Sequence, residues 1–338
     1  MFTISNRRYT GSKYKLLDWI EQLINENCSG DTFFDVFAGT GVVSDRMKNS
    51  FQTIIMNDFL YSNETIYKAF YGSDKYSSEL IEEFKTKYRA IDPEKIGENY
   101  FSENFGGNFF SHNDARIIGC IRDDIEDNKT ILSDREYCIL ITSLLYSADK
   151  VANTVGHYDA YRKIEHINDR FVFDTIEIKK NKTKFKIYRE DSNVLVRSVK
   201  ADVAFVDPPY NSRQYSRFYH VLENLTKWEK PKLEGTALKP PAENMSDYCR
   251  SSAPEIFEDL IQHLNVKYIV VTYNNTYNSK SSSSRNKITL EQIKEILGKK
   301  GYTCEFEKQH QFFNAGKTEF DNHKEYVFIT EVGRHEED

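Results

Sequence analysis

Cysteine is scarce in this sequence, and the few cysteines are too scattered to form a recognisable site. The chain has no Cys-x-x-Cys pair and no cysteine and histidine spacing of the zinc-binding kind; its five cysteines are Cys28, Cys120, Cys138, Cys249 and Cys304. This pattern predicts neither a disulfide framework nor a zinc site, and we expect no metal. Reduced thiols are the usual state of cysteine in the cytoplasm.

Long apolar runs are also missing. No segment approaches the roughly 18 consecutive apolar residues that suggest a membrane-spanning helix, and the first residues contain no apolar stretch of the signal-peptide kind. We therefore expect a cytoplasmic protein with no membrane partner.

Positive charge is not in excess, because 46 Lys and Arg residues face 52 Asp and Glu residues, for a net charge of −6. This balance argues against a protein coated with nucleic acid over its whole surface, although it leaves room for a local basic groove. Aromatic residues, in contrast, are abundant, with 22 Tyr and 23 Phe. They can fill a core, and flat rings also suit base stacking.

The pattern of apolar residues predicts an α/β protein. The chain opens with a helical pattern, a strand, a glycine turn, a second helix and a second strand, at residues 13–27, 32–37, 38–41, 42–49 and 53–56. Further strands are predicted at 184–188, 203–206 and 268–272. Two closing runs, 303–313 and 325–331, suit an antiparallel hairpin at the end of a mostly parallel sheet.

Residues 62–169 lack a convincing strand and carry helical patterns at 115–126 and 135–151. We interpret them as a mainly helical insertion in one catalytic domain formed by residues 1–61 and 170–333. The serine-rich segment 279–284 is expected to be a surface loop, and residues 334–338 a frayed tail.

A strand ending at Asp35 leads into the turn Val36-Phe37-Ala38-Gly39-Thr40-Gly41. Glycines in such a turn let the backbone approach a nucleotide-like ligand and let a helix begin at once. A plain strand-to-helix connection is the alternative. Ser44 stands where a dinucleotide-binding fingerprint would have its third glycine, which argues against an oxidoreductase.

Asp58 follows the second strand, 23 residues after Asp35, near the spacing at which an acid reaches a ribose hydroxyl. It could equally cap the next helix. Phe59, beside it, could stack on an adenine ring or belong to the core.

The strongest signal is Asp207-Pro208-Pro209-Tyr210, which follows the buried strand pattern at 203–206. The prolines fix a rigid turn whose carbonyls face outward, so a carboxylate and a carbonyl form a clamp for two protons. Such a clamp fits an exocyclic amine and aims its lone pair at an electrophilic methyl group. Tyr210 offers a face for a flipped-out base. An ordinary turn with a helix-capping aspartate is the alternative.

These motifs resemble those of the α-group adenine-N6 DNA methyltransferases, the Dam-like and FokI-type modification enzymes. The resemblance spans both ends of the catalytic core: segments 8–13, 35–41, 190–192 and 207–215, together with Asp58. It implies a Rossmann-like fold and S-adenosyl-L-methionine as cofactor, with no metal. Tyr9 stands where Dam-like enzymes often have Trp, and the insertion is not recognisably theirs.

The resemblance also implies roles for individual residues. The segment that holds the methionine portion of the cofactor matches Tyr9, Gly11, Ser12 and Lys13, with Lys13 a partner for its carboxylate. The cofactor loop matches Asp35, Phe37, Gly39 and Gly41. Asp58 matches the ribose acid, and Asp191 matches the position beside the cofactor adenine. The clamp for the target adenine matches Asp207, Pro208 and Tyr210.

Several basic residues are candidates for DNA contact. Four alternating lysines share one face of an extended segment, namely Lys180, Lys182, Lys184 and Lys186. An edge strand guarded by lysines is an equally good interpretation. Close to the clamp follow Arg213, Tyr215 and Arg217. The segment 148–162, with His157, also resembles a stretch of FokI-type enzymes, but the residues themselves assign it no chemical step.

The predicted function is site-specific adenine-N6 methylation of duplex DNA by base flipping, as the modification enzyme of a restriction-modification system that acts separately from a cognate endonuclease. The alternatives are methylation of adenine in ribosomal RNA, methylation of cytosine N4 and, from another class, a non-catalytic DNA-binding module. Reading of the bases is assigned to the insertion 62–169. The rival segment is 211–250, which carries Arg213, Arg217, Lys227, Lys230, Lys232 and Lys239.

Overall fold

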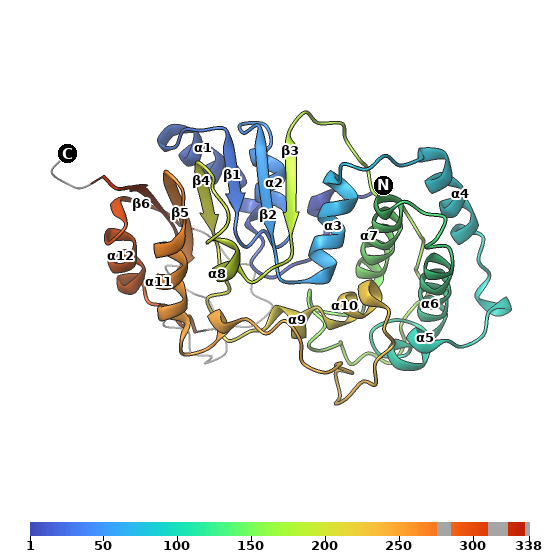
Figure 1. Cartoon of the computed structure of the whole chain (residues 1–338). Helices are drawn as coiled ribbons and strands as arrows, with labels where there is room; N and C mark the ends of the chain where they lie inside the picture. Colours follow the sequence, from blue (N-terminus) through green and yellow to red (C-terminus); the bar gives the residue numbers. More distant parts are fainter. Residues whose placement is uncertain (276–284, 310–323, 335–338) are drawn as a thin grey trace. The chain divides into compact units, whose positions relative to one another are not determined.

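The computed structural model describes residues 1–275, 285–309 and 324–334. In these residues seven strands form one sheet, in the order β3-β2-β1-β4-β5-β7-β6 (Figure 1). Strands β3, β2, β1, β4 and β5 pair in parallel, and β7 runs antiparallel to both β5 and β6. The bounds are β1 Thr32–Asp35, β2 Thr53–Asn57, β3 Lys184–Tyr188, β4 Val203–Val206, β5 Tyr268–Asn274, β6 Gly301–Gln309 and β7 Lys324–Val332. The predicted mostly parallel sheet with an antiparallel end is confirmed.

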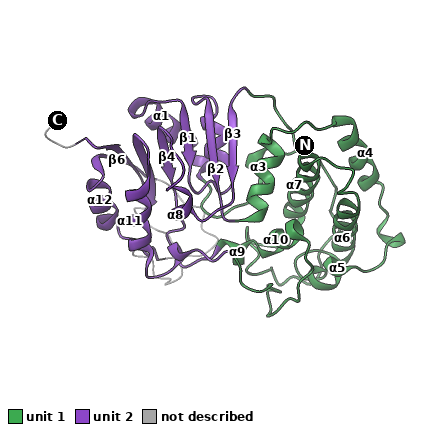
Figure 2. Ribbon diagram, in the orientation of Figure 1, with its two compact units in different colours: residues 1–12, 60–181, 215–243 green, residues 13–59, 182–214, 244–338 purple. Residues whose placement is uncertain are grey.

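The chain forms two compact units (Figure 2). The sheet unit consists of residues 13–59, 182–214 and 244–338. The helical unit consists of residues 1–12, 60–181 and 215–243. It contains the whole predicted insertion 62–169. It also contains residues 1–12, 60–61, 170–181 and 215–243, which were predicted to belong to the catalytic domain.

Helices cover both faces of the sheet unit, which explains why its central strands are apolar on both sides. The strands β1, β2 and β4 are buried almost throughout. Phe34 and Val36 face the core formed with α8 (Ser192–Leu195), α11 (Ala253–His263) and α12 (Leu290–Gly298). On the other face lie α1 (Leu17–Asn27) and α2 (Val42–Met47) (Figure 1). Short 3-10 turns, η2 (Lys13–Leu16) and η4 (Asp247–Cys249), complete the unit.

The helical unit is built around α7 (Asp134–Val151), which is buried along most of its length and contacts α3, α4, α6 and α10. Ser133 and Glu136 form a capping box that starts it. The predicted helical patterns at 115–126 and 135–151 correspond to α6 and α7. The other bounds are η1 Ile4–Asn6, α3 Tyr61–Tyr71, α4 Ser78–Arg89, η3 Pro93–Lys95, α5 Tyr100–Phe105, α6 His112–Asp127, α9 Tyr215–Phe218 and α10 His220–Lys227.

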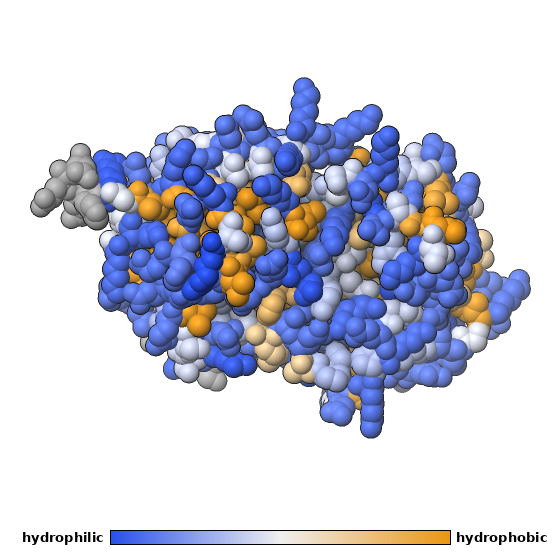
Figure 3. Space-filling model, in the orientation of Figure 1, coloured by the Kyte–Doolittle hydropathy of each residue, from blue (hydrophilic) through white to orange (hydrophobic). Residues whose placement is uncertain are grey.

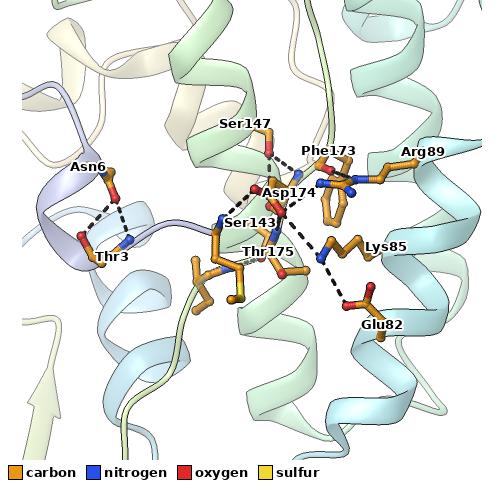
Figure 4. A network of polar contacts seen from close by, with 12 residues as sticks. Thr3, Asn6, Glu82, Lys85, Arg89, Ser143, Ser147, Phe173, Asp174 and Thr175 are labelled. Atoms are coloured by element: carbon orange, nitrogen blue, oxygen red, sulfur yellow. Dashed lines mark hydrogen bonds and ion pairs between the residues drawn. The ribbon is translucent and has the colours of Figure 1, made fainter.

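A polar network around Asp174 holds the start of the chain within the helical unit (Figure 4). The amino group of Met1 lies 2.8 Å from the Asp174 carboxylate, and Arg89 of α4 donates to that carboxylate at 3.2 Å. Ser147 of α7 accepts the Asp174 amide at 3.0 Å. Phe2 pairs with the strand-like segment at Ile176. The first residues are thereby ordered against two helices.

Charged and polar residues cover most of the face shown in Figure 3, with hydrophobic residues visible in patches between them. Within the described parts of the chain, no helix is both long and apolar enough to span a membrane. The loop expected at 279–284, the end of the run 303–313 and residues 335–338 of the tail lie outside the described residues.

Candidate active site

The glycine turn connects β1 to α2 at the carboxyl edge of the sheet. Gly39 and Gly41 have φ values of 55° and 76°, in the left-handed region where a side chain is strained. The Gly41 amide donates to the Ala38 carbonyl at 2.7 Å, and the Ala38 amide donates to the Asn57 carbonyl at 2.8 Å. The tight turn of the sequence prediction is therefore present, and β2 supports it.

Asp58 holds this turn from the end of β2. Its carboxylate accepts the Gly39 amide at 3.0 Å. The N-cap position of the following helix α3 is occupied by Leu60, two residues after Asp58. Phe59 is half-buried. The roles of Asp58 at a ribose and of Phe59 at an adenine stay predictions.

Asp35 is the last residue of β1, directly before the turn, and is 1% exposed. Its carboxyl accepts the Ser44 hydroxyl at 2.7 Å. Burial raises the pKa of Asp35 to about 7, and the nearby charges of Asp207 and Asp58 act in the same direction. Ser44, at the position where a third glycine was missing, is thus the hydrogen-bond donor to a buried acid.

Asp207 follows β4 and is held by two donors from different elements. The Lys13 ammonium lies 2.8 Å from Asp207 Oδ2, and the Thr272 hydroxyl of β5 donates to Oδ1 at 2.7 Å. Both side chains of the ion pair are largely buried, with 11% of Lys13 and 18% of Asp207 exposed. The carboxylate is therefore fixed at the carboxyl edge of the sheet, where ligands bind in open α/β folds.

Lys13 has a partner within the protein, because its ammonium pairs with the Asp207 carboxylate. Its contact with the cofactor carboxylate, which the resemblance implies, stays a prediction. Burial lowers the pKa of Lys13, but the carboxylates of Asp207 and Glu325 outweigh it and raise the pKa above its ordinary value. Lys13 is therefore charged.

Tyr210 is packed into the core of the sheet unit and is 6% exposed. Its hydroxyl donates to the Thr272 carbonyl, and its ring meets Tyr273 edge-on, with 5.0 Å between the ring centroids. Burial raises its pKa well above the usual value. Pro208 is buried and Pro209 half-buried. The stacking of a base on Tyr210 stays a prediction, because Tyr210 has so little exposed surface in this structure.

Two further predicted cofactor residues lie in the sheet unit. Asp191 is exposed and caps α8, where its carboxylate accepts the Val194 amide at 3.1 Å. Phe37 is half-buried and meets Tyr248 edge-on, with 5.1 Å between the ring centroids.

Sequence reasoning missed Asn57, which is fully buried at the end of β2. Its amide nitrogen donates to the carbonyls of Val36 and Glu190 at 3.2 and 3.1 Å, and its oxygen accepts the Glu190 amide at 3.0 Å. It thereby joins the ends of β1, β2 and β3. A polar residue at the end of an otherwise apolar strand was the available signal.

In the helical unit, the predicted cofactor residue Tyr9 stacks on two tyrosines. Its ring centroid lies 5.1 Å from Tyr215 and 4.7 Å from Tyr219. The Tyr219 hydroxyl accepts the Thr10 amide at 2.8 Å, and the Tyr215 hydroxyl donates to the Thr10 carbonyl at 3.0 Å. Gly11 has a φ of 83°, and a Cβ there would lie 3.1 Å from the Tyr215 hydroxyl. Ser12 ends this segment.

The same unit explains the segment 148–162. Asp149 is buried and accepts the Arg8 amide at 3.1 Å and the Tyr158 hydroxyl at 2.9 Å. His157 stacks on Phe218, with 4.6 Å between the ring centroids. The Asp149 contact with Arg8 holds the start of the chain, and the His157 ring packs against Phe218, so both give the segment a structural role.

The predicted DNA contacts differ in their surroundings. The four lysines 180, 182, 184 and 186 are exposed, and β3, which carries two of them, is an edge strand of the sheet. In the rival segment, Lys227, Lys230 and Lys239 each pair with an acid. Arg217 donates to the Pro240 carbonyl at 2.6 Å, and the Arg213 carbonyl accepts from a buried cysteine. The exposed lysines remain the better candidates for phosphate contact.

No group of three or more His, Cys, Asp or Glu side chains that could hold a metal ion occurs among the described residues.

Comparison with known proteins gives one consistent family. Modification methylase StsI of Streptococcus sanguinis is 34% identical over 287 residues, which cover 79% of this chain and 44% of the relative. Type II methyltransferase M.FokI of Planomicrobium okeanokoites is 30% identical over 352 residues, which cover 95% and 52%. Type II methyltransferase M.CviAII of Paramecium bursaria Chlorella virus 1 is 30% identical over 336 residues, which cover 96% and 98%.

The chain thus spans about half the length of the first two relatives and nearly all of the third. The model of the D12 class N6 adenine-specific DNA methyltransferases matches residues 9–277, which include the glycine turn, Asp58 and the Asp-Pro-Pro-Tyr motif. On this match, which covers most of the sequence, the chain belongs to the D12 class N6 adenine-specific DNA methyltransferase family.

Proposed function

We propose that this protein transfers a methyl group from S-adenosyl-L-methionine to N6 of adenine at a specific site in duplex DNA. The observation that carries the proposal is the Asp207 carboxylate, held by Thr272 and Lys13 where β4 ends beside the strand that leads into the glycine turn. Its relatives StsI and FokI are named as a modification methylase and a type II methyltransferase, which supports a role in restriction-modification.

The residues at the sheet edge fit the proposed cofactor. The left-handed glycines at 39 and 41 leave the backbone of the turn without side chains, and Asp58 is oriented by the Gly39 amide. A carboxylate at this place suits a ribose diol, and half-buried rings at 37 and 59 suit an adenine. When bound, S-adenosyl-L-methionine supplies a methyl group activated by a sulfonium.

Asp207 and the Pro208 carbonyl are proposed to accept the two protons of the adenine amine. Accepting both protons leaves the nitrogen lone pair pointing out of the clamp, so the protein contributes mainly orientation. The amine loses a proton on methylation, and the Asp207 carboxylate is the nearest base that the clamp provides. An adenine paired in a duplex cannot reach such an edge, so we propose that it is flipped out of the helix.

Recognition of the site is proposed to belong to the helical unit, since the clamp itself makes no distinction between neighbouring sequences. The exposed lysines 180, 182, 184 and 186 are proposed to contact phosphates. We further propose that the protein works in the cytoplasm, beside a separate restriction endonuclease that cuts the same sequence.

The proposal is tested by incubating the purified protein with labelled S-adenosyl-L-methionine and unmodified duplex DNA, single-stranded DNA or ribosomal RNA. The nucleic acid is then digested, and the labelled nucleoside is identified. We expect N6-methyladenine from duplex DNA with the wild type and none with Asp207→Ala. Label in N4-methylcytosine, or label in ribosomal RNA alone, would replace the proposed substrate by one of the two alternatives that suit the same clamp.

A further inference from the structure

Thr272 is a buried residue of β5 whose side chain bonds to the clamp. It is 1% exposed, and its hydroxyl donates to Asp207 Oδ1 at 2.7 Å. The register between β4 and β5 pairs Val206 with Val271, so the next residue on each strand is Asp207 and Thr272. The bond is therefore set by the geometry of two neighbouring strands.

This bond and the Lys13 ion pair restrain different atoms of one carboxylate. Thr272 binds Oδ1, and Lys13 binds Oδ2 at 2.8 Å. Two donors on two oxygens fix both the position and the rotation of the carboxylate plane, which one donor alone would leave free. Each carboxylate oxygen has two lone pairs, so each can accept a further bond from a substrate amine.

We propose that Thr272 is a positioning residue for methyl transfer, which it assists by setting the rotation of the Asp207 carboxylate. This inference rests on the proposed function. The hydroxyl of Thr272 is neutral. It therefore orients the Asp207 carboxylate, and with it the lone pairs, without neutralising the negative charge of that carboxylate. Loss of the hydroxyl therefore misaligns the amine, and misalignment lowers the rate of the chemical step more than it lowers affinity.

A substitution can isolate this role because Thr272 makes a second contact through its backbone. The Thr272 carbonyl accepts the Tyr210 hydroxyl, and that bond survives a change of side chain. Thr272→Val keeps the branched shape and removes only the hydroxyl, whereas Thr272→Ser keeps the hydroxyl and removes a methyl group.

The sheet unit also offers a matched control. Thr330 of β7 is fully buried, and its hydroxyl shares a 2.9 Å hydrogen bond with the hydroxyl of Thr303. Thr330→Val therefore removes a buried threonine hydroxyl from the same sheet without touching Asp207.

The experiment compares the wild type with Thr272→Val, Thr272→Ser and Thr330→Val in single-turnover methylation of duplex DNA. Affinity for S-adenosyl-L-methionine and for DNA, and thermal unfolding, are measured on the same preparations. We expect Thr272→Val to lower the single-turnover rate by about 10- to 100-fold with little change in either affinity. Thr272→Ser should restore most of the rate, and Thr330→Val should keep the wild-type rate at a similar loss of stability.

Equal rates for Thr272→Val and Thr330→Val would overturn the inference, as would a Thr272→Ser variant no faster than Thr272→Val. If Thr272→Val does not fold, Thr272→Cys replaces it, because a thiol keeps the size and donates weakly; a wild-type rate for Thr272→Cys would overturn the inference. A wild type that methylates no adenine would overturn the proposed function and this inference together, whereas an active wild type with an unaffected Thr272→Val overturns this inference alone.

Discussion

The two units hold their polar groups in different ways. In the sheet unit, the candidate carboxylates Asp35, Asp58 and Asp207 stand at the edge where parallel strands end, and each accepts one or two short hydrogen bonds from a neighbouring residue. In the helical unit, Tyr9 is held by a stack of aromatic rings, and the buried guanidinium of Arg7 lies 5.1 Å from the centroids of two of those rings.

This difference separates the chemistry from its support. Asp58 and Asp207, which are not fully buried, can accept a substrate, since their oxygens retain bonding capacity. A stack of rings contributes packing, and its value lies in ordering the chain segment 7–12. We therefore expect substitutions in the sheet unit to act on turnover and on cofactor binding, and those in the helical unit to act first on stability.

The largest expected effect is on the sheet unit. Asp207→Asn should lower methyl transfer by at least about 10²–10³-fold, because the amide replaces one acceptor by a donor at the clamp. Asp202, at the opposite end of the same strand, accepts the amides of Asp31 and Thr32 and serves as the control. Asp202→Asn should lower thermal stability and keep the single-turnover rate, and equal losses of rate in the two variants would contradict the assignment of Asp207.

Asp35 should make the sheet unit less stable as pH rises. Its pKa is raised from 3.8 to about 7 in the folded protein. The unfolded chain releases this proton near pH 4, whereas the folded protein keeps it until about pH 7, so stability falls across that window. Each pKa unit corresponds to about 1.4 kcal/mol, so the loss approaches about 4 kcal/mol.

Asp35→Asn should abolish this loss, because the amide can still accept the Ser44 hydroxyl and does not ionise. Urea unfolding of both proteins at pH 4.5 and pH 7.5, chosen as roughly the ends of the window, measures it. If the two proteins differed in the free energy of unfolding by the same amount at both pH values, the assignment of this pH dependence to Asp35 would be contradicted.

His220 should give the helical unit the opposite dependence. It is buried in α10, and its ring nitrogens lie 3.0 and 2.8 Å from the carbonyl oxygens of Arg217 and Ala237. Burial lowers its pKa from 6.5 to about 4, although the two carbonyls favour the charged form. Below about pH 6.5 the unfolded chain therefore binds a proton at this residue, whereas the folded protein does not. The free energy of unfolding consequently falls as the pH falls from 6.5 towards 4.

Across this pH range the free energy of unfolding is expected to fall by about 3 kcal/mol, and His220→Gln should reduce that fall. Hydrogen exchange resolves the two units, so protection in α10 should decrease on acidification while protection in β1 does not. Parallel changes in both would show that a single transition governs the whole chain.

Tyr219→Phe tests the contact that orders the start of the chain. The change keeps the ring stack and removes the hydroxyl that accepts the Thr10 amide, so we expect a loss of about 1–3 kcal/mol in the free energy of unfolding. Affinity for S-adenosyl-L-methionine should fall as well if segment 9–13 holds the methionine portion. Denaturant unfolding and calorimetry provide the two measurements, and an unchanged stability would contradict the structural part.

The smallest effect is expected at the edge of the sheet. Replacing Lys184 and Lys186 by Ala should weaken DNA binding at low salt and reduce the slope of log affinity against log salt by about 1–2, since both side chains are exposed on β3. Lys267→Ala, a lysine already paired with Asp202, is the control. Equal slopes for all three proteins would leave the edge-strand interpretation standing.

Much of the sheet unit follows from local sequence. Strands 184–188 and 203–206 were predicted with the bounds that the structure gives. The first alternates Lys with Phe and Ile, and the second is a short apolar run; both patterns are typical of strands. The glycine turn and the Asp-Pro-Pro-Tyr motif were likewise found from local sequence. In the helical unit, only α6 and α7 were identified among the helices, since the shorter α3 and α5 lack an extended periodic pattern.

The partners of the site residues did not follow from sequence. Thr272 meets the Asp207 carboxylate because β4 and β5 are neighbours in the sheet, and Lys13 reaches the same carboxylate from η2, near the start of the chain. Likewise, Tyr9 and Tyr219 are far apart in the chain and meet through tertiary packing. Pairing between distant residues leaves no periodic signal in the sequence. Motifs and patterns therefore predict the candidate site residues but not the residues that hold them in place.

The helical unit is assembled from three pieces of chain, 1–12, 60–181 and 215–243, and so the polypeptide passes between the units at five points. If this unit reads the DNA sequence, as proposed, an exchange of sequence specificity between relatives would have to transplant all three pieces. A chimaera that receives only residues 62–169 would keep the host's Tyr9, Tyr215 and Tyr219 while replacing Asn63 and Asp149, which bind Arg7 and Arg8. On that proposal, new specificity is more easily reached by substitutions within this unit than by recombination of one segment.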